Sequence, residues 1–199
     1  MAVLLRGGRS GTAWPRVTRT VVTAAVLDPF SLAEAKAQSR IDLAEEDALL
    51  EDYLKAATRR VETDTGMALL TQTVDLTFDG LPQGWGVLDL PIGPVQSITS
   101  VTYIDTSAVS QTMASGDRLL SGSRIGLIDT ASWPTDIRGF APVTVRVVAG
   151  YTTAALIPAD LRMAVRLVFG WLVAHREPDE FDLDVYEGWI RGYRRVLIA

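Results

Sequence analysis

The sequence predicts an α+β protein, built as a helical bundle of two N-terminal and two C-terminal helices with an inserted antiparallel β lobe. Two observations predict this fold class. In residues 31–66 and 158–199, apolar residues recur at helical spacing. In residues 68–150, stretches of alternating apolar and polar residues and stretches rich in β-branched residues are separated by turns. Helices interrupted by a block of strands are typical of α+β folds. We expect one connected domain over residues 28–199, preceded by an arm over residues 1–27.

The composition excludes several classes of function. The chain has 199 residues, no cysteine and one histidine. Disulfides, zinc–thiolate sites, thiol nucleophiles and a two-histidine metal site within one chain are therefore excluded. The net charge of -5 disfavours tight binding to DNA, because that affinity comes from clustered cations. No uninterrupted apolar run reaches the roughly 20 residues of a bilayer span, so we expect no membrane partner.

The arm over residues 1–27 is locally basic and is punctuated by glycines and by Pro15. It has two interpretations, which the sequence leaves open. It is either a frayed terminus or an arm that becomes ordered against a neighbouring subunit. In the second interpretation, the inter-subunit contacts come from Arg6, Arg9, Trp14 and Arg16.

Two helices are expected in residues 31–66. The first begins at a capping box formed by Ser31 and Glu34, and it ends near residue 40. The second covers residues 44–65 and stops at Gly66, the residue type that favours a left-handed helix end. Apolar residues near helical spacing predict its buried stripe as Leu49, Tyr53, Ala56, Ala57 and Val61.

The β lobe over residues 68–150 is expected to contain short strands. Residues 74–79 alternate apolar and polar side chains, which predicts a strand with one buried face and one face exposed to solvent. Further strands are predicted at residues 87–90, 95–104, 118–120, 124–128 and 143–149.

The C-terminal half of the predicted bundle begins at Pro158, which suits the first position of a helix. Residues 161–174 are apolar on nearly all sides, which predicts a buried helix. The last helix, about residues 183–197, has more aromatic and apolar surface than its position requires. Its glycines at 188 and 192 would let another backbone approach closely. It either packs on its own domain or binds a partner, since Trp, Tyr and Arg are enriched in interfaces.

Catalytic motifs are not found. His175 lies at the end of an apolar helix, where it suits the negative end of the helix dipole. The sequence contains no Gly-x-Ser-x-Gly elbow, no Walker loop and no Gly-x-Gly-x-x-Gly turn. We therefore expect no catalytic residue, no metal, no cofactor and no enzymatic activity. A hydrolase that uses an unrecognised carboxylate pair and a monomeric binding module remain alternatives.

An ordered set of short motifs resembles a known family. The motifs are PFSLAEAK (29–36), EDALL (46–50), RVE (60–62), TG (65–66), LTQT (70–73), LPIGPVQSI (90–98), VTY (101–103), VTV (143–145), AGY (149–151), IP (157–158) and RE (176–177). Together they resemble the head–tail connector (adaptor) proteins of long-tailed phages, prophages and gene transfer agents, over about residues 17–195.

The resemblance implies a structural subunit without enzymatic activity. Such subunits form a homo-oligomeric ring, usually a dodecamer, in the neck of a virion or phage-like particle, after assembly in the host cytoplasm. The ring docks under the portal protein, a stopper or other tail-side neck protein binds below it, and DNA passes through without tight binding. An acidic lumen would suit that passage. A stopper is the alternative neck component. The resemblance places the portal interface at Trp189, Ile190, Tyr193, Arg194, Val196, Leu197, Ile198 and Ala199.

Overall fold

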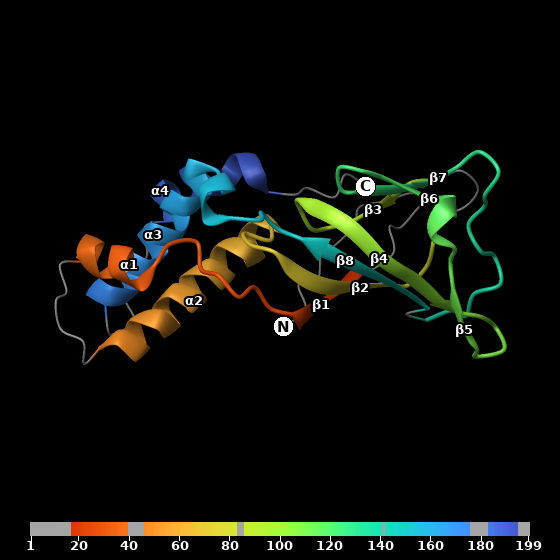
Figure 1. Cartoon of the computed structure of the whole chain (residues 1–199), viewed down its shortest axis with the longest axis horizontal. Coiled ribbons are helices and arrows are strands. Elements are labelled where there is room, and N and C mark those ends of the chain that lie inside the picture. Colours follow the sequence, from red (N-terminus) through yellow and green to blue (C-terminus); the bar gives the residue numbers. More distant parts are fainter. Residues whose placement is uncertain (1–16, 40–45, 83–85, 141, 176–182, 195–199) are drawn as a thin grey trace. The chain divides into compact units, whose positions relative to one another are not determined.

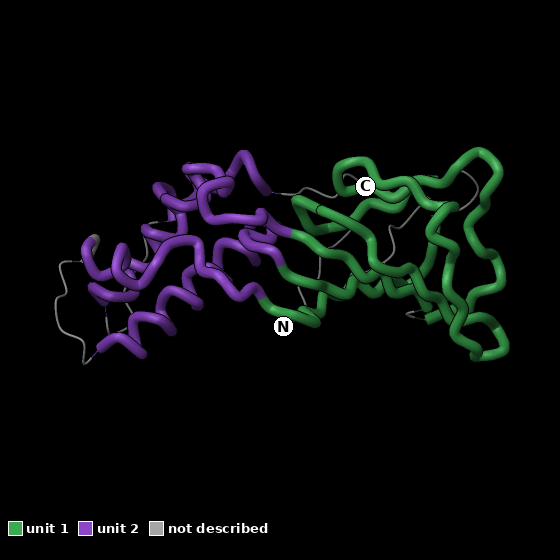
Figure 2. The backbone as a smooth tube through the Cα atoms, in the orientation of Figure 1, with its two compact units in different colours: residues 1–24, 72–149, 196–199 green, residues 25–71, 150–195 purple. Residues whose placement is uncertain are grey.

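The computed structural model describes residues 17–39, 46–82, 86–140, 142–175 and 183–194. Contacts within the chain divide it into two compact units (Figure 2). Unit 1 comprises residues 1–24, 72–149 and 196–199, and unit 2 comprises residues 25–71 and 150–195. Each unit is therefore assembled from segments that are distant in sequence.

The larger sheet of unit 1 has five antiparallel strands in the order β1-β2-β8-β4-β5 (Figure 1). In β2 and β8 every second residue is buried, and the register places Leu76 opposite Val145 on the buried face. On the other face, Arg146 donates two hydrogen bonds to Asp75, at 2.7 and 2.8 Å. The strands are β1 (Val17–Thr23), β2 (Gln72–Phe78), β4 (Val95–Ile104), β5 (Ser110–Thr112) and β8 (Val143–Ala149).

A smaller sheet in unit 1 has three antiparallel strands in the order β3-β7-β6. These are β3 (Leu88–Asp89), β6 (Arg118–Ser121) and β7 (Arg124–Leu127). Leu88 and Ile125 face each other in register and are both buried. The chain after β7 is anchored by Trp133, whose buried indole Nε1 donates to the carbonyl of Gly86 at 2.7 Å.

Unit 2 contains the α-helices of the described chain. They are α1 (Leu32–Ser39), α2 (Asp47–Thr65), α3 (Ala159–Ala174) and α4 (Leu183–Ile190). Their buried side chains form one apolar core, to which α2 and α3 contribute most. Phe30, just before α1, packs edge-on against Phe169 of α3, with ring centroids 6.0 Å apart.

The predicted start of the first helix and the predicted end of the second agree with the structure, whereas Glu46, inside the predicted second helix, precedes α2 as its N-cap residue. At the start of α1, the carboxylate of Glu34 accepts the backbone N–H of Ser31 at 2.8 Å, and the Ser31 hydroxyl accepts the N–H of Glu34 at 3.2 Å. At the end of α2, Gly66 has a left-handed φ of 71°. Both features are local, which explains why the sequence predicts them.

The predicted buried stripe of α2 is partly wrong. The buried residues are Leu50, Leu54, Ala57, Val61 and Thr65. By contrast, Leu49 and Ala56 are exposed and Tyr53 is half-buried. A shift of one residue rotates a helix face by about 100°. The orientation of α2 therefore depends on the elements that pack against it.

The backbone conformation of Gly150 explains the AGY motif (149–151) of the family resemblance. Its φ is 110°, a conformation that disfavours any side chain. A Cβ atom at this position would lie 2.1 Å from the carbonyl oxygen of Leu70. Only glycine therefore permits the close approach between the segments that carry Leu70 and Tyr151, which form an isolated parallel bridge.

The expectation of a helical bundle with an inserted β lobe is wrong. The described residues form a mixed α+β fold, with four α-helices and two antiparallel sheets that have their own buried face. Two of the helices, α1 and α4, have only eight residues, little more than two turns, which is too short for the long packing seam of a bundle. The larger sheet also begins before α1, because β1 pairs with β2.

Among the described residues, no helix combines the length and the apolar character that crossing a bilayer requires.

Candidate functional site

The candidate site is the C-terminal part of unit 2, because the sequence predicts a partner contact there. It consists of α4 and the 3-10 turn that follows it (Arg191–Tyr193). Apolar side chains in this segment point in two directions. The inward ones fix the segment to unit 2, and the outward ones form an exposed surface.

The inward side of α4 is part of the core. Tyr186 and Ile190, one helical turn apart, have no exposed surface, and Tyr193 packs against the same core from the 3-10 turn. Complete burial of two large side chains contributes several kcal/mol, at about 1.5–3 kcal/mol each. Burial therefore holds this short helix in place.

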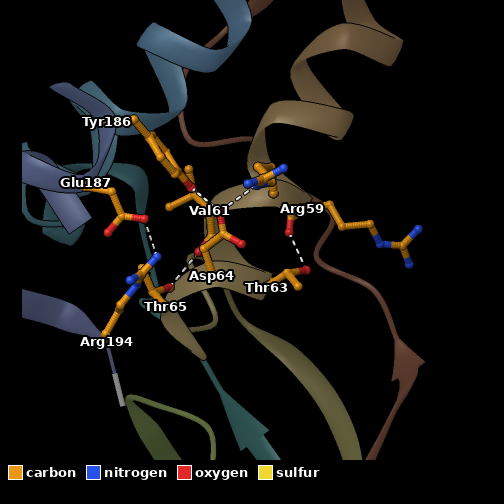
Figure 3. A network of polar contacts seen from close by, with 9 residues as sticks. Arg59, Val61, Thr63, Asp64, Thr65, Tyr186, Glu187 and Arg194 are labelled. Atoms are coloured by element: carbon orange, nitrogen blue, oxygen red, sulfur yellow. Dashed lines mark hydrogen bonds and ion pairs between the residues drawn. The ribbon is translucent and has the colours of Figure 1, made fainter. Parts of the chain in front are cut away.

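A polar network also joins α4 to α2 (Figure 3). The Tyr186 hydroxyl donates to Oδ2 of Asp64 at 2.8 Å, and Nε of Arg60 donates to the same oxygen at 2.5 Å. Burial raises the pKa of Tyr186, and the neighbouring Asp64 carboxylate adds to this effect. The hydrogen bond from Arg60 to Asp64 raises the pKa of Arg60. The Tyr186 phenol therefore stays protonated, and its hydroxyl keeps donating to Asp64.

Two further contacts fix the end of the segment. The Tyr193 hydroxyl donates to Oδ2 of Asp160, in the first turn of α3, at 3.2 Å. The guanidinium of Arg194 pairs with the carboxylate of Glu187 on α4 (Figure 3). Both contacts are exposed, so we expect each to contribute less than about 1 kcal/mol. They orient the chain more than they stabilise it.

The outward side of α4 is apolar and open. Leu183, Val185 and Trp189 are exposed by 53%, 49% and 37%. A Cβ atom built at Gly188 or at Gly192 would meet no atom within 4 Å. Leu183 is exposed in the first turn, on the side of the helix that carries Tyr186 and Ile190. We call Val185, Gly188, Trp189 and Gly192 the outward surface of α4. It combines an aromatic anchor with space for a partner's backbone, which suits protein binding.

The predicted portal-interface residues fall into different positions. Trp189 belongs to the outward surface, whereas Ile190 lies in the core. Tyr193 is half-buried, and Arg194 is paired with Glu187. Residues Val196, Leu197, Ile198 and Ala199 lie outside the described residues. So do the predicted arm residues Arg6, Arg9, Trp14 and Arg16.

Sequence reasoning missed two parts of this site. Val185 could have been found, because on a helical wheel it lies opposite the face that Tyr186 and Ile190 share. Leu183 could not, because it lies seven positions before Ile190 and therefore on that same face, where the spacing predicts burial. Asp64 could not have been found, since it is 122 positions away from Tyr186 and no local pattern links them.

Residues suited to other chemistry do not form a second site in the described chain. Within the residues that the structure describes, no three His, Asp or Glu side chains are grouped so that they could hold a metal ion. His175 stacks on Trp171, with ring centroids 5.4 Å apart, and its backbone N–H caps the Trp171 carbonyl at 2.9 Å. These contacts give His175 a structural role at the end of α3.

Residues 30–121 match the family described as phage gp6-like head-tail connector proteins. The family resemblance predicted from the sequence is confirmed. The matched segment runs from the residue before the capping box into β6, and thus includes parts of both units. A comparison with curated proteins finds no match.

Solved structures are similar to this connector-like chain over nearly its whole length. A chain in the neck of an empty GTA particle, computed with C6 symmetry, is 25% identical with a TM-score of 0.75, and the likeness covers 92% of this chain and 97% of that one. A chain in the neck of a native GTA particle, computed with C12 symmetry, is 26% identical with a TM-score of 0.71, over 92% and 97%.

A third likeness shows the shared fold alone. A chain in the virion of a native gene transfer agent particle is 24% identical with a TM-score of 0.74, over 91% of this chain and 97% of that one. The family and the neck structures consist of structural particle components. The prediction of a structural role without enzymatic activity is therefore confirmed.

Proposed function

We propose that this chain is a head–tail connector subunit that forms a ring in the neck of a virion or phage-like particle, with the portal protein on one side and a stopper or other tail-side neck protein on the other. The observation that carries the proposal is the combination of the family match with the likeness to two neck structures. One of those was computed with C12 symmetry, which supports a dodecamer.

The outward surface of α4 supports a portal contact. A subunit in a closed ring needs two complementary faces for its neighbours, and any further partner needs a third surface. An exposed tryptophan beside an exposed valine and open glycines fits such a surface, because aromatic residues carry much of the binding free energy of interfaces. Trp189 is therefore the proposed portal anchor.

The charge of the chain supports the passage of DNA without tight binding. The net charge is -5, so the assembled ring carries a negative charge that repels phosphate. We propose that Asp and Glu side chains outnumber Lys and Arg side chains along the lumen. A weak and uniform affinity for duplex DNA in low salt, measured by fluorescence anisotropy, is the expected result. Tight binding would contradict this proposal.

Because Ile190 is buried, a C-terminal deletion is a poor test of portal docking. Deleting residues 189–199 removes a fully buried side chain, so loss of docking after this deletion would not separate binding from folding. The substitution Trp189→Ala avoids that difficulty. The matched control is Leu156→Ala, because Leu156 is an exposed apolar residue elsewhere in unit 2, at 59% exposure.

The test uses the full chain with purified portal protein, followed by size-exclusion chromatography with light scattering. We expect the unmodified chain and the Leu156→Ala variant to form a ring and to bind portal. Trp189→Ala should weaken portal binding by about 30-fold, the effect of a 2 kcal/mol anchor. A chain that stays monomeric with portal would contradict the proposed function. Equal binding by both variants would contradict the role of Trp189.

A further inference from the structure

β1 is an edge strand without strong protection. It lies at one end of the five-stranded sheet, and among the described strands it pairs only with β2. Six of its seven residues are Val or Thr, which favour extended backbone. An edge strand exposes backbone N–H and C=O groups to which another strand can pair. Its composition and position therefore suit strand addition.

The C-terminal end of β1 carries exposed apolar side chains. Val21 and Val22 are exposed by 40% and 46%. The register with β2 shifts between Val21 and Thr23, so Val22 has no partner residue in β2. The opposite edge of the sheet differs, because β5 has only three residues, all exposed and none of them apolar. The apolar side chains make β1 the better edge for an added strand.

We propose that the edge of β1 receives the N-terminal segment of a neighbouring copy, residues 1–16, as an added strand. This inference rests on the proposed ring. The segment joins the chain directly at Val17, and 16 residues span roughly 50 Å when extended, enough to reach an adjacent subunit. Its basic residues also suit a neighbour with a net charge of -5.

The residues before β1 favour a neighbouring copy over the chain's own strand. A tight two-residue hairpin needs a type I′ or II′ turn, whose first central residue has a positive φ. Pro15 would occupy that position in a turn over residues 14–17, and proline fixes φ near -65°. Pro15 therefore disfavours a two-residue hairpin at residues 14–17, which favours pairing with an adjacent copy.

The first experiment uses the absence of cysteine from the chain. A double variant, Leu4→Cys with Val22→Cys, is assembled into rings, oxidised and run on a non-reducing gel. We expect a ladder of covalent oligomers, because each segment reaches the next copy. The matched control, Leu4→Cys with Val109→Cys, carries its second cysteine at a similarly exposed valine in unit 1 and should give no ladder. Equal ladders from both variants, or a cross-linked monomer from the first, would overturn the proposal.

The second experiment does not depend on which residues of the added strand lie opposite β1. It therefore decides the case in which neither cysteine variant cross-links. Amide hydrogen exchange in residues 18–23 is compared between rings of the full chain and rings that lack residues 2–16. We expect exchange to be about tenfold slower in the full chain. Equal exchange in two rings with the same number of subunits would overturn the strand addition and leave the proposed function standing. If the full chain gives no ring with portal protein, the proposed function itself fails.

Discussion

α1 and α4 are both eight residues long, but they are held in different ways. α1 begins with reciprocal hydrogen bonds between Ser31 and Glu34, which lie three positions apart. α4 is fixed by the burial of Tyr186 and Ile190 and by a hydrogen bond to Asp64 on a distant helix. One short helix is thus specified locally and the other by tertiary contacts.

The outward sides of these two helices differ as well. α1 exposes Glu34, and its Lys36 is paired with Asp47 at 2.6 Å. The outward side of α4 exposes Val185 and Trp189. A polar outward side needs no partner, whereas an apolar one is stabilised when a partner covers it. The comparison teaches that the residues that hold α4 and the residues that we propose for binding are different, so substitutions can separate them.

The largest expected effect comes from Ile190→Ala. This change opens a cavity at a fully buried position, and such changes cost about 2–5 kcal/mol of the free energy of unfolding. Urea denaturation followed by circular dichroism measures the change. A loss below about 1 kcal/mol would mean that α4 contributes little to the core. It would return Ile190 to the candidate binding residues.

Tyr186→Phe tests the polar part of the attachment. The change keeps the buried ring and removes the hydroxyl that donates to Asp64. Because the acceptor is a carboxylate that keeps Arg60, we expect a loss of about 1–2 kcal/mol in the same denaturation experiment. Portal binding of the folded variant should be unchanged. An unchanged free energy of unfolding would show that burial alone holds α4.

Gly188→Ala should separate stability from binding in one variant. A methyl group at this position meets no atom within 4 Å, and alanine stabilises a helix by about 1 kcal/mol relative to glycine. The melting temperature should therefore rise. Portal binding should weaken, because the methyl group occupies the space proposed for a partner's backbone. Unchanged portal affinity would exclude a close approach at this position.

The smallest effect is expected at the start of α1. Hydrogen bonds from Ser31 lower the pKa of Glu34 in the folded protein. The carboxylate therefore stabilises the fold above its ordinary pKa, and this contribution is lost as the pH falls below that value and through the lowered pKa of the folded protein. Glu34→Gln removes that titration, so its free energy of unfolding should depend less on pH in this range. An unchanged pH dependence would mean that ionisation of Glu34 in the capping box makes no measurable contribution to the free energy of unfolding.

The sequence alone predicted the local features of this protein. The capping box at Ser31 and the helix end at Gly66 depend on residues within four positions of each other, and the alternation in residues 74–79 directly indicates a strand with one buried face. The family motifs, which extend along most of the chain, also predicted the structural role. All of these signals come from residue types at short spacing, and the tertiary structure does not alter them.

The tertiary structure decided which surfaces meet. It rotated the buried face of α2 to Leu50 and Leu54, joined β1 to the edge of a sheet, and brought Asp64 to Tyr186 across 122 positions. It also replaced the expected bundle with a mixed α+β fold in two units. The physical reason is that burial depends on the neighbours that a face contacts, and the spacing of residues along one element does not specify those neighbours.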